Sequence, residues 1–332
     1  MIDSFGRRLN YLRLSLTERC NFGCVYCVPR EGLPMVQDRS ALTQDEIVRL
    51  VSLLATKGIR KVRLTGGEPL LRRDLVDIVR RLKNISGIED VSLTTNGSLL
   101  AALAKPLQAA GLDRVNISLD RLNPKRFAEI TGSQLYERVL EGAFAALDAG
   151  FGVKLNMVVL RDLSEREICD FVELARRHPI EVRFLEFMPL CGEAWDTAAF
   201  WPIREVRRLV EENFLLSTEL PRHDEVAQTF ALRKGQGRVG FIGSVSESFC
   251  ENCTRLRLTV DGKIRPCLFS DLEFPLGPLL KNQATDAEIF AVVESAVAKK
   301  PRGNQFLETP FDGVGSGPAV IPGTPLIHHI GG

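Results

Sequence analysis

The sequence predicts an α/β protein: an incomplete barrel of six strand–helix units, followed by a smaller α+β extension. From residue 11 to 190, apolar strand-like runs alternate with segments of helical period, and parallel strands joined by helices explain that alternation. Beyond Trp195 the rhythm changes to shorter elements. We therefore expect a partial barrel over residues 1–195, an extension over 196–300 and a Gly/Pro-rich tail over 301–332.

Six apolar runs have the length of strands. They lie at Tyr11–Leu16, Lys61–Thr65, Asp90–Thr94, Asp113–Leu119, Gly152–Leu160 and Glu181–Phe187. The spacing of ~25–35 residues leaves room for a crossover helix, which predicts parallel pairing with right-handed connections. Six units are fewer than the eight of a closed barrel, so the barrel should be open.

The segments between these runs have the period and the ends of helices. They cover Thr43–Lys57, Asp74–Asn84, Leu99–Ala110, Tyr136–Ala149 and Ser164–Arg177. Thr43 and Glu46 form a capping box, and Gly58, Gly111 and Gly150 end their helices. In the extension, Arg204–Asn213 is helical, Thr229–Arg233 and Arg238–Val245 are strands, and Leu256–Cys267 is a hairpin.

Composition indicates a folded protein with no global preference for nucleic acid or membrane. The 332 residues carry a formal charge of +1, from 43 basic and 42 acidic side chains. No stretch approaches the ~20 apolar residues that span a bilayer, and the first residues do not resemble a signal peptide. We expect a cytoplasmic protein, in which the eight cysteines are reduced rather than paired as four disulfides.

Two cysteine triplets are the main chemical feature. The first triplet is Cys20, Cys24 and Cys27, and the second triplet is Cys250, Cys253 and Cys267. Three thiolates leave one position of a metal centre open for a ligand. Zinc, a ferredoxin-like electron carrier and buried structural thiols are the alternatives. Of the other cysteines, Cys169 is expected to pack in its helix, and Cys191 has no assigned role.

Polar segments follow the predicted strands at their carboxyl ends, where the chemistry of such architectures gathers. The first triplet follows the first strand and Gly66-Gly67-Glu68 follows the second. Glycines at such a turn let the backbone come close to a ligand and expose amide groups, although an ordinary tight turn gives the same pattern. Asn116 and Asp120 belong to the fourth of these segments.

Cys20-Asn-Phe-Gly-Cys-Val-Tyr-Cys27, placed after a strand, resembles the radical S-adenosylmethionine (SAM) superfamily. The resemblance implies a 4Fe–4S cluster on the first triplet, whose open iron is chelated by the amino and carboxylate groups of SAM. It also implies that Gly66, Gly67 and Glu68 hold the SAM amino group. The other residues that it assigns to SAM are Tyr26, near the adenine, Ser118 and Met188.

The second triplet, within Phe249-Cys-Glu-Asn-Cys-Thr-Arg-Leu-Arg, together with the terminal Gly331-Gly332, resembles the GTP 3′,8-cyclase family of molybdenum-cofactor biosynthesis. The resemblance implies a second 4Fe–4S cluster that binds the purine, and paired glycines that reach into the site. A disordered terminus is the alternative for Gly331 and Gly332. The implied GTP contacts are Arg13, Arg63, Thr94, Lys154, Arg255, Leu256 and Arg257. The residues implied in catalysis are Arg255, Arg257, Gly331 and Gly332.

Charge supports the same substrate, because a triphosphate carries about four negative charges and is best held by several arginines or lysines. Lys61 and Arg183 add to the cations already named, and Lys61 shares a strand face with Arg63. A charged residue on the inner face of an apolar strand is costly without an anionic partner. Snorkelling or an acidic partner is the alternative for any single residue.

The implied reaction starts with one electron from an external reductant. SAM is cleaved, the 5′-deoxyadenosyl radical takes hydrogen from C3′ of GTP, and C3′ adds to C8, giving (8S)-3′,8-cyclo-7,8-dihydro-GTP. The product would pass to a cyclic pyranopterin monophosphate synthase. We expect a monomer or homodimer. A peptide-modifying radical SAM enzyme and a zinc-stabilised binding module are the competing hypotheses, and Thr254 and the segment 301–324 depart from the family pattern.

Overall fold

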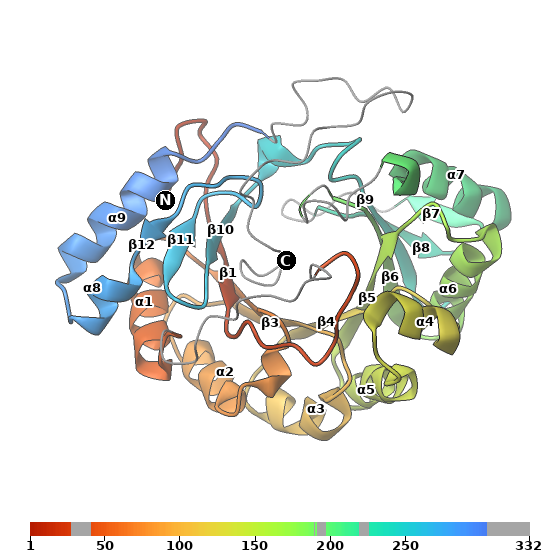
Figure 1. Ribbon diagram of the computed structural model, residues 1–332, viewed down its shortest axis with the longest axis horizontal. Coiled ribbons are helices and arrows are strands. Elements are labelled where there is room, and N and C mark those ends of the chain that lie inside the picture. Colours follow the sequence, from red (N-terminus) through yellow and green to blue (C-terminus); the bar gives the residue numbers. More distant parts are fainter. Residues whose placement is uncertain (28–40, 189, 191–196, 219–225, 304–332) are drawn as a thin grey trace.

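The computed structural model describes residues 1–27, 41–188, 190, 197–218 and 226–303. In these ranges a single twelve-stranded sheet, ordered β12-β11-β10-β1-β2-β3-β4-β5-β6-β9-β8-β7, curves into an open barrel with helices on its outside (Figure 1). None of the described helices is long and apolar enough to cross a bilayer.

The six predicted barrel strands are confirmed, and they pair in parallel in sequence order. They are β1 (Tyr11–Ser15), β2 (Lys61–Thr65), β3 (Asp90–Thr95), β4 (Arg114–Ser118), β5 (Gly152–Val159) and β6 (Ile180–Glu186). The predicted helices are α1 (Gln44–Thr56), α2 (Leu75–Lys83), α3 (Leu100–Ala109), α5 (Tyr136–Asp148) and α6 (Glu165–Arg177). Thr43 and Glu46 form the predicted capping box of α1.

One barrel helix was not predicted. Helix α4 (Pro124–Thr131) follows β4 and precedes α5. The side chain of Asn123 caps its first turn by accepting hydrogen bonds from the N–H groups of Lys125 and Arg126. Gly132 ends the helix in the left-handed conformation, with φ of 65°. Asn-Pro at the start and Gly at the end are the sequence signals that would have found it.

The extension is divided between the two ends of the barrel sheet. At one end, β9 (Arg238–Ile242) pairs in parallel with β6, and β8 (Gln228–Leu232) and β7 (Leu216–Thr218) follow. At the other end, β10 (Arg255–Leu258) pairs in parallel with β1, and β11 (Lys263–Arg265) and β12 (Phe274–Pro275) follow. Strand pairing over long sequence distances therefore joins the extension to both ends of the barrel sheet.

The described part of the extension also contains three α-helices: α7 (Ile203–Asn213), α8 (Gly277–Lys281) and α9 (Asp286–Ala298). The first was predicted, and the other two were not. Thr285 and Glu288 form a capping box for α9, which was a readable signal in the sequence. Figure 1 shows α8 and α9 beside β12 and β11, far from α7 at the other end of the sheet.

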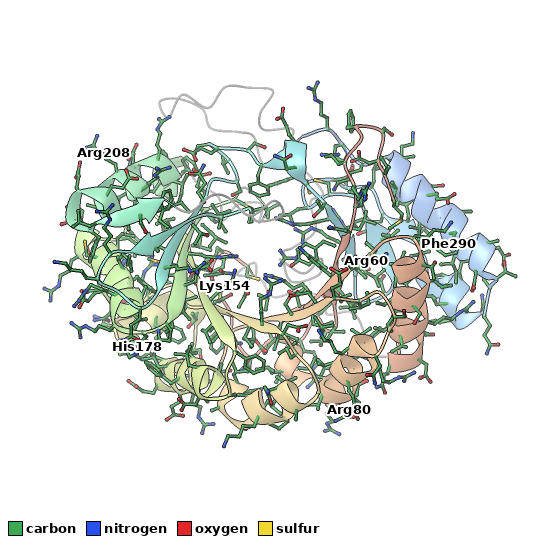
Figure 2. The ribbon with its side chains drawn as sticks, turned by 180° about the vertical axis from the view of Figure 1, so that it is seen from behind. Arg60, Arg80, Lys154, His178, Arg208 and Phe290 are labelled. Atoms are coloured by element: carbon green, nitrogen blue, oxygen red, sulfur yellow. The ribbon has the colours of Figure 1, made fainter. Side chains whose placement is uncertain are left out.

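Strand alternation separates an apolar outer layer from a polar interior. On β1, Leu12 and Leu14 are fully buried in the main core under the helices, whereas Arg13 between them lines the inner side. Figure 2 shows the same contrast: Lys154 lies inside the barrel, and Arg80 and Arg208 lie at its outer rim. The interior is thus the place to look for chemistry.

Candidate functional site

A cavity of about 400 Å³ lies on the inner side of the sheet. Its lining comes from β1 to β6 and from β9 and β10, which extend the sheet. Eight of its described lining residues are cationic: Arg13, Lys61, Arg63, Arg114, Lys154, Arg183, Arg255 and Arg257. Two, Asp120 and Glu186, are acidic. All seven cations named from the sequence thus line one space, and Arg114 is the one that sequence reasoning missed.

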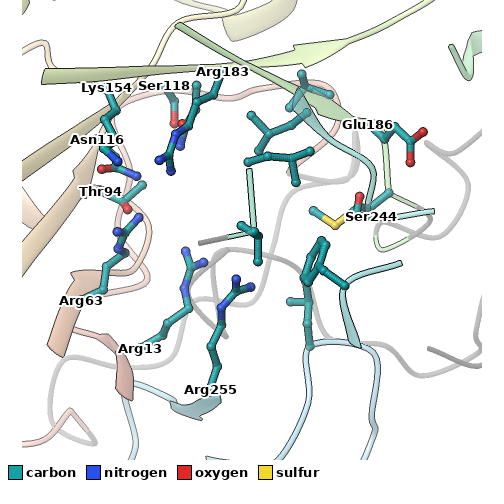
Figure 3. Close-up of a pocket in the computed structure, with 18 of the residues that line it drawn as sticks. Arg13, Arg63, Thr94, Asn116, Ser118, Lys154, Arg183, Glu186, Ser244 and Arg255 are labelled. Carbon is teal, nitrogen blue, oxygen red and sulfur yellow. The ribbon is translucent and has the colours of Figure 1, made fainter. Parts of the chain in front are cut away.

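The sheet register places cations of neighbouring strands side by side (Figure 3). Arg13 pairs with Arg63 on one side and with Arg257 on the other, and the strands are about 4.8 Å apart. Burial lowers the pKa of Arg13 well below its ordinary value, and Arg257 lowers it further. Burial, together with Arg255, lowers the pKa of Arg257 to about 10. Buried like charges this close favour an anionic ligand.

Acidic partners compensate three of the cations. Lys154 lies 3.3 Å from a carboxylate oxygen of Glu181, which also pairs with Arg183. Arg114 lies 2.7 Å from Asp90. The acid-partner alternative therefore applies to cations on β4 to β6. On β10, β1 and β2, Arg257, Arg13 and Arg63 form a row of neighbouring like charges, the arginine row.

The first triplet lies in the loop after β1. Gly23 N–H donates to the Thr131 carbonyl of α4 at 2.8 Å, and Val25 N–H donates to the Ile130 carbonyl of the same helix at 2.9 Å. Phe22 N–H donates to the Cys20 sulfur at 3.4 Å, a contact that stabilises a thiolate. Cys20 is exposed, and Cys24 and Cys27 are half-buried. Three cysteines on one anchored loop fit an iron–sulfur cluster with an open edge.

An acidic group lies beside this triplet. The Tyr26 hydroxyl donates to Asp120, which also accepts the Val158 N–H at 2.8 Å. Burial and Asp120 raise the pKa of Tyr26 well above its ordinary value, and the same two causes raise the pKa of Cys24. Burial also raises the pKa of Asp120 itself. Tyr26, Asp120 and Ser118 all line the cavity, so its end near the first triplet carries an acidic group.

Gly66 and Gly67 serve the loop of the first triplet. A Cβ on Gly66, whose φ is 142°, would lie 2.3 Å from the Thr17 carbonyl oxygen, and one on Gly67 would lie 2.4 Å from that of Arg19. The N–H of Gly67 donates to Thr17 and that of Glu68 to Arg19, at 2.7 and 2.8 Å. These two amides are therefore not presented to a ligand as expected, so a role of this segment in SAM binding has to come from its other groups.

Glu68 holds the ends of β2 and β3 together. Its carboxylate is fully buried and accepts from Thr95 Oγ1 at 2.7 Å, Leu70 N–H at 2.9 Å and Asn96 N–H at 2.7 Å. Burial raises its pKa to about 7, although the three donors oppose that shift. These contacts give Glu68 a structural role at the carboxyl end of the barrel.

The sequence predicted no role for Glu186. It is fully buried at the end of β6 and accepts from Ile203 N–H, which begins α7, at 2.8 Å. It also accepts from Val245 and Ser246 N–H, at 2.7 and 2.9 Å. Glu186 thereby joins the barrel to the extension two residues before Met188, which lines the cavity.

The second triplet is held by two basic side chains. Arg7 Nη1 donates to the Cys250 carbonyl at 2.8 Å. Lys300, which is 3% exposed, donates to the carbonyls of Arg255 at 2.8 Å and Pro266 at 2.6 Å, next to two of the cysteines. Burial would raise the pKa of Cys253, but Lys300 and Arg255 outweigh it and the pKa is lowered. Thiolates held in this way fit a second iron–sulfur cluster.

The two triplets lie at opposite ends of the barrel. Strands β1 and β10 are parallel, and Tyr11, the first residue of β1, pairs with Arg255. The second triplet has two cysteines before Arg255, whereas the first triplet follows Ser15 at the end of β1. The cavity lining includes Tyr26 from the first loop and Phe249 beside the second, so it extends from one triplet towards the other.

One predicted GTP contact does not line this cavity, and the two tail glycines cannot be placed. Leu256 is fully buried in the main core, because it points to the face opposite Arg255 and Arg257, and its side chain does not line the cavity. Gly331 and Gly332, like Cys191, lie outside the described residues. Among the described residues, no three His, Cys, Asp or Glu side chains are placed to hold a single metal ion.

Comparison with known proteins follows the same division of the chain. A family model described as the radical SAM superfamily matches residues 14–175, and one described as Molybdenum Cofactor Synthesis C matches residues 180–306. A "GTP 3′,8-cyclase" of Heliobacterium modesticaldum is 43% identical over 325 residues, covering 97% of this chain and 98% of the relative.

Longer relatives and solved structures are also similar. "Molybdenum cofactor biosynthesis protein 1" of Drosophila melanogaster is 43% identical over 91% of this chain, and this chain covers 54% of it. The mouse relative is 43% identical over the same share and is covered to 48%, so the chain spans about half the length of these two. Streptococcus suis SuiB bound to SAM has a TM-score of 0.59 and 15% identity, covering 91% of this chain and 74% of that one, which shows the fold alone.

Proposed function

Because the chain belongs to the GTP 3′,8-cyclase family, we propose that it converts GTP to (8S)-3′,8-cyclo-7,8-dihydro-GTP in molybdenum-cofactor biosynthesis. One observation carries the proposal: a cavity rich in buried cations extends between two cysteine triplets at opposite ends of a barrel. A zinc-stabilised binding module and an electron carrier lack this support, since neither needs such a cavity.

The cofactors of this family are SAM and two 4Fe–4S clusters. When bound and reduced, they supply a 5′-deoxyadenosyl radical. The first triplet would hold one cluster, and Tyr26, Ser118 and Met188 would line SAM. The segment Gly66-Gly67-Glu68 would position SAM through its carbonyls and through its packing on the first loop. The second triplet would hold the other cluster.

The chain's own contribution is to hold two ligands of opposite charge. Arg13, Arg63 and Arg257 would bind the triphosphate, since it carries about four negative charges and relieves their repulsion. Asp120 lies at the other end, where SAM carries a sulfonium and an ammonium group. The remaining proposed GTP contacts are Lys61, Thr94, Lys154, Arg183 and Arg255, with Leu256 acting through its backbone. Gly331 and Gly332 remain proposed from the resemblance.

The proposal includes partners that the chain does not contain. An external one-electron reductant would supply the first electron, and a cyclic pyranopterin monophosphate synthase would take the product. We also propose a cytoplasmic location and a monomeric or homodimeric state.

Anaerobic incubation of the reconstituted protein with SAM and a reductant, with either GTP or ATP, tests the proposed function. We expect 5′-deoxyadenosine to form with GTP and not with ATP, and the cyclised nucleotide to accumulate. Equal amounts with both nucleotides, or none with either, would exclude it. Iron and sulfide analysis of the same sample should give about eight of each per chain, whereas about two zinc ions and no sulfide would support the binding module.

A further inference from the structure

Asn116, in the middle of β4, is a buried polar side chain to which nothing above gives a role. It is 1% exposed, and neither Oδ1 nor Nδ2 has a hydrogen-bond partner among the described residues. It lines the cavity, and Figure 3 shows it between Thr94 and Lys154. Because buried polar atoms are nearly always paired in folded proteins, an amide left unpaired at a cavity indicates a ligand.

The unpaired atoms continue onto the neighbouring strands. Thr94 on β3 is directly opposite Asn116, and its hydroxyl also lacks a partner. On β5, Asn156 lines the same cavity, pairs in register with Ser118 and leaves its Oδ1 unpaired. Four unpaired atoms therefore face one space from three adjacent strands: Thr94 Oγ1, Asn116 Oδ1, Asn116 Nδ2 and Asn156 Oδ1.

The mixture of donors and acceptors selects the ligand's chemistry. A phosphate oxygen accepts hydrogen bonds and cannot donate, so it would leave the amide oxygens of Asn116 and Asn156 unpaired beside a negative charge. A hydroxyl group both donates and accepts, and so does the hydroxyl of Thr94. Adjacent hydroxyl groups, as on a ribose, can satisfy the whole set.

The position of the set agrees with a sugar of the substrate. Ser118, two residues further along β4, is a proposed SAM contact, and the arginine row around Arg13 is the proposed triphosphate site. In the proposed reaction the ribose has to lie between them, because its C3′ gives up hydrogen to the radical derived from SAM.

If the chain has the proposed function, the nucleotide is GTP, and on that basis we propose that Asn116, with Thr94 and Asn156, binds its ribose hydroxyls. This contact positions C3′ and selects ribonucleotides over deoxyribonucleotides. A site built to hydrogen-bond a substrate hydroxyl rejects an analogue that lacks it, because its own polar groups are then left unpaired. Asn116 is thus a specificity-determining and positioning residue.

Equilibrium binding to the anaerobically reconstituted protein tests the assignment, with GTP, 2′-deoxy-GTP and 3′-deoxy-GTP as probes. For the unsubstituted protein we expect at least one deoxy analogue to bind about tenfold more weakly than GTP. In Asn116→Ala, the affinity for GTP should fall by about tenfold, to no more than the affinity for that analogue. Asn10→Ala removes another buried amide oxygen that lacks a partner, and since Asn10 does not line the cavity, it should retain the full preference.

Folding is checked separately from recognition. Asn116→Ala should keep its iron content and should not unfold at a lower temperature, because it removes unpaired buried atoms rather than a contact. An unchanged ratio of GTP to deoxy-GTP affinity in Asn116→Ala would overturn the proposal.

Two further probes separate the ribose of GTP from other partners. ITP lacks the guanine amino group, and its affinity for Asn116→Ala should fall in parallel with that of GTP. A loss of affinity confined to GTP would assign Asn116 to the base. A loss of SAM affinity with GTP binding intact would assign it to the sugar of SAM. Either result would overturn the proposal, whereas failure of the unsubstituted protein to bind GTP would reject the proposed function as well.

Discussion

The two cysteine triplets have the same number of thiols but are held in different ways. The loop of the first is tied by backbone hydrogen bonds to α4 and packs on Gly66 and Gly67, and burial with Asp120 raises the pKa of Cys24. The second is held by the side chains of Arg7 and Lys300, and cations lower the pKa of Cys253. The two triplets thus have different charged groups beside them, with opposite effects on the pKa of a cysteine.

This difference corresponds to the ligands that we propose. SAM carries positive groups and would meet the end with Asp120, whereas GTP is strongly anionic and would meet the arginine row beside the second triplet. Strand pairing creates the polarity, since β10 places Arg255 and Arg257 beside Arg13. The following predictions test the comparison, from the largest expected effect to the smallest.

Replacing one cysteine in each triplet should separate the two sites. Cys24→Ser should abolish formation of 5′-deoxyadenosine, because SAM would lose the iron that it binds. Cys253→Ser should lose about half of the iron and abolish conversion of GTP, while the barrel stays folded. Iron analysis and product chromatography measure both. Retained GTP conversion in Cys253→Ser would contradict a substrate-binding role for the second triplet.

At the end of the barrel near the first triplet, Glu68 should make the stability of the protein depend on pH. Burial raises its pKa from an ordinary 4.5 to about 7. Between these values the folded protein keeps a proton that the unfolded chain releases, so stability falls as pH rises through this range. We expect the stability of the protein relative to Glu68→Gln to decrease by about 3 kcal/mol from pH 5 to pH 8. Thermal unfolding at several pH values measures this difference, and a constant difference would contradict the buried carboxyl.

At the second triplet, stability and cluster assembly should depend on Lys300. Lys300→Met leaves the carbonyls of Arg255 and Pro266 without their donor, which should lower the free energy of unfolding by about 2 kcal/mol. It should also impair assembly at the second triplet and spare the first. Lys299→Met is the matched control, because Lys299 is exposed. Equal effects of the two variants would show that Lys300 does not hold this site.

The smallest expected effect concerns the arginine row. Arg13→Gln should weaken GTP binding by about tenfold and, without nucleotide, raise the unfolding temperature, because it relieves like-charge repulsion with Arg257 and Arg63. Arg208→Gln, on the outer side of α7, should change neither quantity. A lower unfolding temperature in Arg13→Gln would mean that the row is already compensated within the protein.

Local patterns predicted the barrel, because apolar strand runs and helix caps are short-range signals. The predictions failed where a contact joins distant parts of the sequence. No periodicity reports that β9 pairs with β6 or β10 with β1, and nothing near Lys300 indicates that it reaches Pro266. The omission of α9 is different, since the capping box of Thr285 and Glu288 was visible.

The candidate site shows the same limit. The cations were predictable because each interrupts an apolar strand, and the cysteines because of their spacing. The role of Glu186 and the unpaired state of Asn116 were not predictable, since hydrogen-bond partners are known only once the strands are in register. Sequence therefore identified the cysteines and most of the cations, and the fold supplied Arg114, Glu186 and Asn116.

Transfer of a labelled hydrogen tests the central claim most directly, because it requires both ligands in one cavity at once. With GTP deuterated at C3′, the account predicts one deuterium in each 5′-deoxyadenosine formed by the anaerobic, reconstituted protein. Unlabelled 5′-deoxyadenosine formed alongside consumed GTP would contradict the placement of the ribose between the two triplets.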